Sequence, residues 1–98
     1  MELQLLERNI DIAVGLLKAL SNERRLMIVC SLYEGEMSVS ALEKHIGISQ
    51  SALSQHLAKL RNDGLVQTRR DAQTIYYSLN SQAANAMLHT LHEIFCPD

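Results

Sequence analysis

Apolar residues recur at alternating spacings of three and four near both ends of the chain, which is the pattern of amphipathic helices. In residues 3–20 this seam consists of Leu3, Leu6, Ile10, Ala13, Leu17 and Leu20. In residues 81–95 it consists of Ala84, Leu88, Leu91 and Phe95. Further apolar residues widen both seams beyond the face that one small subunit can cover. We therefore predict that the first and last helices form the interface of a homodimer.

Capping residues divide the next part of the chain into two shorter helices. The first follows Ser-Asn at residues 21–22 and stops at Gly35. The second is capped by Ser38 or Ser40 and ends at Gly47, a residue that tolerates the left-handed conformation of a helix end.

A fourth helix follows after only three residues, 47–49, and extends from its cap Ser49 to Asn62, before Gly64. Its core-facing residues are predicted to be Leu53, Leu57 and Leu60. Two short helices joined by a tight glycine turn predict a helix-turn-helix.

β-Branched and aromatic residues then replace the helical pattern in residues 65–70 and 74–79, separated by the turn residues 71–73. A β-hairpin directly after a helix-turn-helix is a wing. The predicted fold class is therefore mainly α with a β-hairpin wing, in the order of four helices, two strands and a last helix. We expect residues 1–98 to form a single winged helix-turn-helix domain.

Composition narrows the class of protein. The 98 residues are 47% hydrophobic and 20% charged, which is a globular balance. No apolar run approaches the roughly 20 residues that span a bilayer, so we expect a cytoplasmic protein with no membrane partner. Neither a catalytic constellation nor a glycine-rich phosphate loop is evident, so we expect no enzyme and no cofactor.

The net charge of −2 argues weakly against nucleic acid, because binding to the phosphate backbone depends on Lys and Arg. The charges are unevenly distributed, however. Residues 49–78 contain Lys59, Arg61, Arg69 and Arg70 but only two acidic residues. One basic surface is therefore still available for double-stranded operator DNA.

The fourth helix carries small and amide side chains opposite its leucines, and such side chains fit a major groove and pair with base edges. The predicted DNA contacts on this helix are Gln50, Ser51, Ser54, Gln55 and Lys59. In the wing, Arg69, Arg70 and Gln73 are predicted to contact phosphates or the minor groove. A solvated polar face and ordinary turn charges are the alternatives.

Three stretches resemble the ArsR/SmtB family of bacterial repressors: residues 17–26 (LKALSNERRL), 49–57 (SQSALSQHL) and 69–78 (RRDAQTIYYS). The resemblance implies a dimer formed by the first and last helices, and operator contacts from the fourth helix and the wing. It is strongest to the BigR, SqrR, YgaV and HlyU group, in which two cysteines respond to oxidants or persulfides. Cys30 and Cys96 occupy the corresponding places. The implied function is a repressor released from DNA by reactive sulfur species or an oxidant.

Three alternatives stay open for this function. From the residues alone, Cys30 is a core side chain shielded from water and Cys96 an idle terminal thiol. His89, His92, Glu93 and Cys96 share one helical face and could serve a metal-responsive repressor with help from another element. The known metal sites of the family look absent, so no metal is expected. An HlyU-like activator that displaces another DNA-bound protein would use the same fold.

Overall fold

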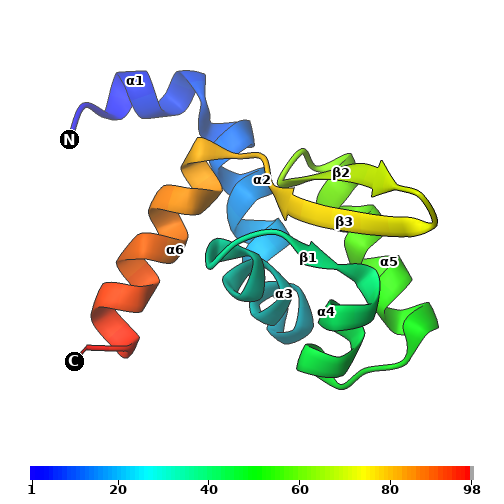
Figure 1. Ribbon diagram of the computed structural model, residues 1–98. Coiled ribbons are helices and arrows are strands. Elements are labelled where there is room, and N and C mark those ends of the chain that lie inside the picture. The colour runs from blue at the N-terminus through cyan, green and yellow to red at the C-terminus, as the bar shows by residue number, and fades with distance from the viewer. Residues whose placement is uncertain (98) are drawn as a thin grey trace.

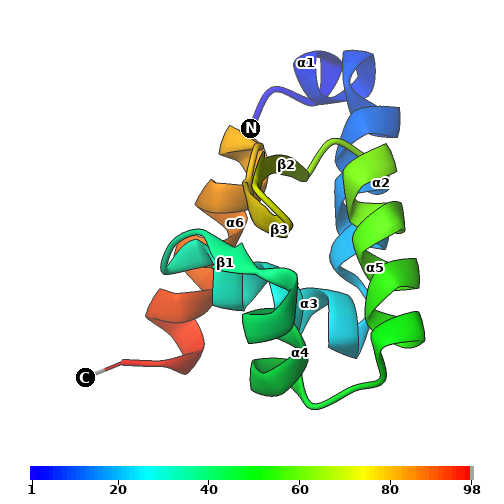
Figure 2. The same ribbon diagram turned by 45° about the vertical axis from the view of Figure 1, so that its right-hand side comes forward.

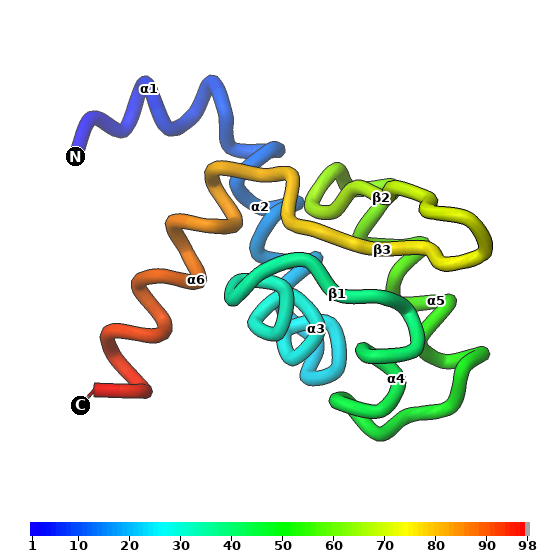
Figure 3. Tube along the Cα trace, viewed as in Figure 1, coloured from blue at the N-terminus to red at the C-terminus, as the bar shows by residue number. Residues whose placement is uncertain are grey.

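The computed structural model describes residues 1–97 and confirms the predicted winged helix (Figure 1). The elements are α1 (Leu3–Arg8), α2 (Ile10–Leu20), α3 (Glu23–Tyr33), β1 (Met37–Ser38), α4 (Val39–Ile46), α5 (Gln50–Asn62), β2 (Val66–Asp71), β3 (Thr74–Leu79) and α6 (Gln82–Phe95). Both chain ends lie on the side of α6, and the β2–β3 hairpin projects to the opposite side (Figure 3). Within the described residues, no helix is long and apolar enough to cross a membrane.

The N-terminal seam is split between two helices rather than carried by one. Asn9 separates α1 from α2 with φ −115° and ψ 15°, outside the helical region. Its side-chain amide donates to the carbonyl of Leu5 at 3.3 Å, so it ends α1 with a local hydrogen bond. Such side-chain to backbone bonds compete with helix continuation, which explains why the apolar spacing alone missed the break.

The predicted caps of the middle helices are confirmed. Asn22 accepts from the Arg25 amide at 3.0 Å and begins α3, and Ser38 accepts from the Ala41 amide at 3.0 Å and begins α4. Ser81 likewise caps α6. These caps satisfy amide groups that have no partner inside the helix.

The sheet has three antiparallel strands in the order β1-β3-β2, so the sequence prediction missed a strand. Met37 pairs with Tyr77 and Ser38 with Tyr76. A two-residue strand has no period-2 pattern to detect, and its partner lies far along the chain. The hairpin turn is also shorter than predicted, because Asp71 pairs with Thr74 and leaves two residues at the tip. Ala72 accommodates the turn with a φ of 57°.

Helix α3 lies at the centre of the core. It contacts α2, α4, α5, α6 and β3. Its Ile28, Val29 and Leu32 are buried among leucines from α4, α5 and α6. No polar side chain is buried within residues 1–97, so the core around α3 is filled by apolar packing.

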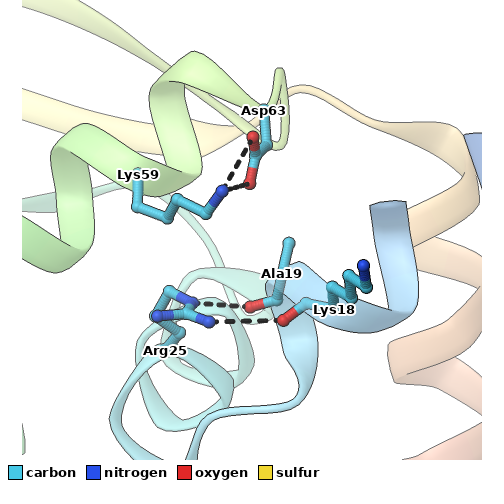
Figure 4. A network of polar contacts seen from close by, with 5 residues as sticks. All are labelled: Lys18, Ala19, Arg25, Lys59 and Asp63. Carbon is cyan, nitrogen blue, oxygen red and sulfur yellow. Dashed lines mark hydrogen bonds and ion pairs between the residues drawn. The ribbon is translucent and has the colours of Figure 1, made fainter. Parts of the chain in front are cut away.

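Arg25 joins α2 to α3 by hydrogen bonds to the carboxyl end of α2 (Figure 4). Its Nε donates to the Ala19 carbonyl at 2.7 Å and its Nη2 to the Lys18 carbonyl at 3.2 Å. These carbonyls carry the negative end of the helix dipole, which favours a cation there. The guanidinium therefore fixes the angle between the two helices.

Replacing Arg25 by Ala should lower the free energy of unfolding by about 2 kcal/mol, because two hydrogen bonds from a charged, partly buried donor are removed. Urea unfolding at a fixed protein concentration measures the change. Arg24→Ala is the matched control, since that guanidinium is exposed and approaches only the Met27 sulfur, at 4.0 Å, within the described chain. Equal losses of stability in the two variants would refute this role of Arg25.

Candidate nucleic-acid interface

The helix-turn-helix has a short connection, residues 47–49. Gly47 ends α4 in the left-handed conformation, with φ 75°, and Ser49 caps α5 by accepting from the Ala52 amide at 3.2 Å. Figure 2 shows the short loop that joins these two helices. The predicted core side chains of α5, Leu53, Leu57 and Leu60, are at most 2% exposed. Burial of this face fixes which side of α5 is presented to solvent.

Every residue of α5 predicted to contact DNA is exposed. Gln50, Ser51, Ser54 and Gln55 lie in its first two turns, and His56 is half-buried as expected. Lys59 pairs with Asp63 at 3.3 Å near the other end of the helix (Figure 4). An exposed pair of this kind contributes little stability, so the Lys59 ammonium is free to leave Asp63 and pair with another anion.

The two wing arginines differ in their surroundings. Nε and Nη2 of Arg69 each donate to a carboxylate oxygen of Glu36 at 2.8 Å, and its guanidinium carbon lies 4.4 Å from the centre of the Tyr76 ring. The hydrogen bond to Glu36 raises the pKa of Arg69 above its ordinary value. Arg70 and Gln73 are exposed, and neither makes a side-chain hydrogen bond or ion pair within residues 1–97.

Arg69 is thus paired with a carboxylate of the same chain at the exposed surface, and its contact with DNA stays a prediction. Sequence reasoning missed Glu36 as its partner. That contact depends on the position of the chain just before β1, and nothing in the local sequence reveals that β1 pairs with β3.

Known proteins share both the sequence and this architecture. Residues 22–68 match the family described as "Bacterial regulatory protein, arsR family". The "Transcriptional activator HlyU" of Vibrio cholerae is 54% identical over 96 residues, which cover 98% of this chain and 89% of HlyU. The chain belongs to the ArsR family of bacterial regulatory proteins.

Solved structures agree with this assignment. The transcriptional repressor BigR of Xylella fastidiosa superposes with a TM-score of 0.92 at 44% identity, over 100% of both chains. A homodimeric winged helix-turn-helix DNA-binding domain from Mycobacterium bovis superposes with a TM-score of 0.79 at 28% identity, over 90% of this chain and 82% of that one. This ArsR-family protein is thus a DNA-binding transcriptional regulator and not an enzyme.

The two cysteines of this ArsR-family chain line one cavity. Cys30 on α3 and Cys96 just after α6 are free thiols. The cavity between these helices has a volume of about 340 Å³. Its other lining residues are Leu26, Tyr33, Leu88, Leu91, His92 and Phe95. The cavity is therefore largely apolar and contains both thiols.

Cys30 is exposed, so the prediction that it would be shielded from water is wrong. It follows Val29 on α3, and one residue turns a helix by about 100°, which carries Cys30 off the core face. Neighbouring side chains still remove some water from its sulfur, and this desolvation, followed by the nearby Cys96, raises the pKa of Cys30 above its ordinary value. A raised pKa keeps the thiol protonated at neutral pH and slows its reaction.

The histidines of α6 are engaged in other contacts. His89 meets the Tyr33 hydroxyl through Nδ1 at 3.1 Å and Glu93 through Nε2 at 3.6 Å. His92 lines the cavity with the two thiols. Within residues 1–97, no three His, Cys, Asp or Glu side chains come together as metal ligands. The metal-responsive alternative that uses His89, His92, Glu93 and Cys96 stays a hypothesis.

The pKa of Cys30 should fall in Cys96→Ser, because the coulombic interaction with Cys96 is removed, and should stay above its ordinary value, because the desolvation remains. The pH dependence of iodoacetamide alkylation, followed by peptide mass, measures this pKa. Pro97→Ala is the control, since it changes the next residue and keeps the Cys96 thiol. An unchanged or higher pKa in Cys96→Ser would show that the two thiols do not interact.

Proposed function

We propose that this protein binds operator DNA as a homodimer and represses transcription until Cys30 and Cys96 are oxidised or persulfidated. The observation that carries the proposal is the pair of free thiols, contributed by α3 and α6, that line one apolar cavity. One of these helices supports the helix-turn-helix, and the other belongs to the proposed dimer interface. A covalent link between them can therefore couple sulfur chemistry to DNA binding.

Exposed apolar side chains support the homodimer. Leu3 is 65% exposed, Ile12 is 73% exposed and Phe95 is 74% exposed. These residues and further exposed apolar ones lie on α1, α2 and α6, the N- and C-terminal helices predicted to form the interface: Leu5, Ile10, Val14, Leu17 and Ile94. An apolar surface of this extent is typical of a protein–protein interface. The homodimeric relative from Mycobacterium bovis provides a precedent.

On DNA, α5 of each subunit enters a major groove. Gln50, Ser51, Ser54 and Gln55 face base edges, because their amide and hydroxyl groups match the donors and acceptors there. Lys59, Arg70 and Gln73 contact the sugar-phosphate backbone. A dimer of this kind reads two half-sites about 34 Å apart, one turn of the duplex.

The switch requires a two-electron oxidation of the thiols. A persulfide RSSH transfers its outer sulfur to one cysteine, which gives Cys–S–SH and releases RSH. The second thiol attacks the inner sulfur of Cys–S–SH, forms the disulfide and releases H₂S. A bridge of this kind requires Cα atoms within about 7 Å, and a longer polysulfide spans a wider gap. Either link ties α6 to α3.

A second candidate function differs only in its effect on transcription, which would be activated instead of repressed. HlyU, 54% identical, is named a transcriptional activator, whereas BigR is named a repressor. An activator would use the same DNA-binding face to displace another DNA-bound protein. A reporter gene in a deletion strain distinguishes the two: expression rises on deletion of a repressor and falls on deletion of an activator.

Replacing Gln55 by Ala should weaken binding to an operator selected from random duplexes by about 1 to 3 kcal/mol, because a bidentate hydrogen bond to a base is removed. Binding to a scrambled duplex should change little. Gln82→Ala is the matched control, because Gln82 is an exposed glutamine on α6. If Gln55→Ala changes neither affinity nor sequence preference, α5 does not read bases with this face.

Placing a charge at Ile10 should dissociate the dimer, since this exposed side chain lies on α2 within the proposed interface. Sedimentation of Ile10→Glu should give the mass of one chain with an unchanged circular dichroism spectrum. Ile75→Glu, at an exposed isoleucine of the wing, should remain a dimer. A folded dimer of Ile10→Glu would contradict this interface.

Treatment with a persulfide should release the wild-type protein from its operator and leave Cys30→Ser and Cys96→Ser bound. Fluorescence anisotropy measures binding, and peptide mapping verifies the bridge. Ser31→Ala, next to Cys30, is a control that keeps both thiols. Release of the double serine variant by persulfide, or tight binding by verified bridged protein, would refute the switch.

A further inference from the structure

We propose that Glu36, acting through Arg69 and Tyr76, positions the wing on DNA, and that Arg70 rather than Arg69 supplies the arginine contact of the wing to phosphate. The inference rests on the proposed function in one respect, that the wing belongs to the DNA-binding surface. It assigns a positioning role to a carboxylate, a residue type that DNA repels.

The three side chains form a row across one face of the sheet. Arg69 of β2 pairs with Tyr76 of β3, and Tyr76 pairs with Ser38 of β1. Paired residues point to the same face of a sheet, as do residues two apart in an extended strand. Glu36, two residues before Ser38, lies within reach of Arg69, which passes over the Tyr76 ring at 4.4 Å.

The row ties the wing to the helix-turn-helix. Six residue pairs join β2 to β3, but only two pairs join β3 to β1. β1 continues directly into α4, and its Ser38 caps that helix. The Arg69–Glu36 bond therefore links the outer strand of the wing to the segment that begins the helix-turn-helix, and limits how the two parts move relative to each other.

The geometry of this contact requires arginine. Two N–H groups of one guanidinium donate to the two oxygens of one carboxylate, both at 2.8 Å. This forked arrangement and the stacking on an aromatic ring are beyond a lysine ammonium. With its charge neutralised and Glu36 beside it, Arg69 is a poor phosphate ligand.

Arg70 is the better candidate for that contact. It follows Arg69 in β2, so its side chain points to the other face of the hairpin. It is exposed, pairs across the strands with Ile75 and makes no side-chain ion pair within the described chain. Its full charge is available to displace counterions from DNA.

The test measures operator affinity across a range of salt concentrations for five variants. Arg70→Gln should flatten the plot of log affinity against log salt by about one unit for each interaction with a phosphate that the substitution removes. Arg69→Lys and Glu36→Gln should each weaken operator binding roughly two- to fivefold, as expected for one exposed ion pair of good geometry, and leave the slope unchanged. Tyr76→Phe should bind like the wild type, because the ring remains. Glu34→Gln, at an exposed carboxylate nearby, is the control and should have no effect.

Tighter binding of Glu36→Gln to every duplex, with a steeper slope, would overturn the proposal, because Arg69 would then be a phosphate contact held back by Glu36. Wild-type binding by Arg69→Lys would also overturn it, because a simple positive charge would then suffice. If Arg70→Gln and Gln55→Ala both bind normally, the DNA-binding surface itself is wrong, and this inference fails with it. A flattened slope in Arg70→Gln with normal binding by Glu36→Gln overturns this inference alone.

Discussion

The packing of α3 is the constraint on which the rest of the structure depends. Its buried face, formed by Ile28, Val29 and Leu32, packs against α4 and α5 of the helix-turn-helix and against α6. Protein interiors are close-packed and transmit small displacements instead of absorbing them. A change in the position of α6 on α3 can therefore reach α4 and α5 without a hinge or a second domain.

The two thiols line the cavity between α3 and α6. Cys30 is on the exposed side of α3, and Cys96 immediately follows α6, whose last turn carries the exposed Ile94 and Phe95. A bond between the thiols restrains one wall of the cavity relative to the other. The raised pKa of Cys30 suits the proposed switch, because little thiolate is present before a sulfur donor arrives.

Local signals in the sequence predicted most of the fold. Glycine and serine caps located α4 and α5, and the spacing of Leu53, Leu57 and Leu60 gave the buried face of α5. Three features could not be found in this way. The break at Asn9 falls within an uninterrupted apolar seam, and β1 depends on pairing with a strand far along the chain. The exposure of Cys30 depends on how α3 is rotated about its axis in the core.

In the candidate DNA-binding site, too, features set by nearby residues could be predicted, and features set by distant residues could not. The exposed face of α5 could be predicted because periodicity determines it, whereas the pairing of Arg69 with Glu36 could not, because the partners lie 33 residues apart. A basic stretch of sequence shows how many cationic side chains are available. It does not show which of them are already neutralised by the fold.

The distance between the α5 helices of the two subunits in the proposed homodimer tests the link between thiol chemistry and DNA binding most directly. Spin labels carried by a non-natural amino acid at the exposed Arg61 of α5 would leave both cysteines intact. Pulsed electron resonance on the reduced dimer and on the same dimer with a verified Cys30–Cys96 bridge compares the two states. The account predicts a shifted label-to-label distance in the bridged dimer, together with loss of operator binding. An unchanged distance in a bridged dimer that has released its operator would contradict it.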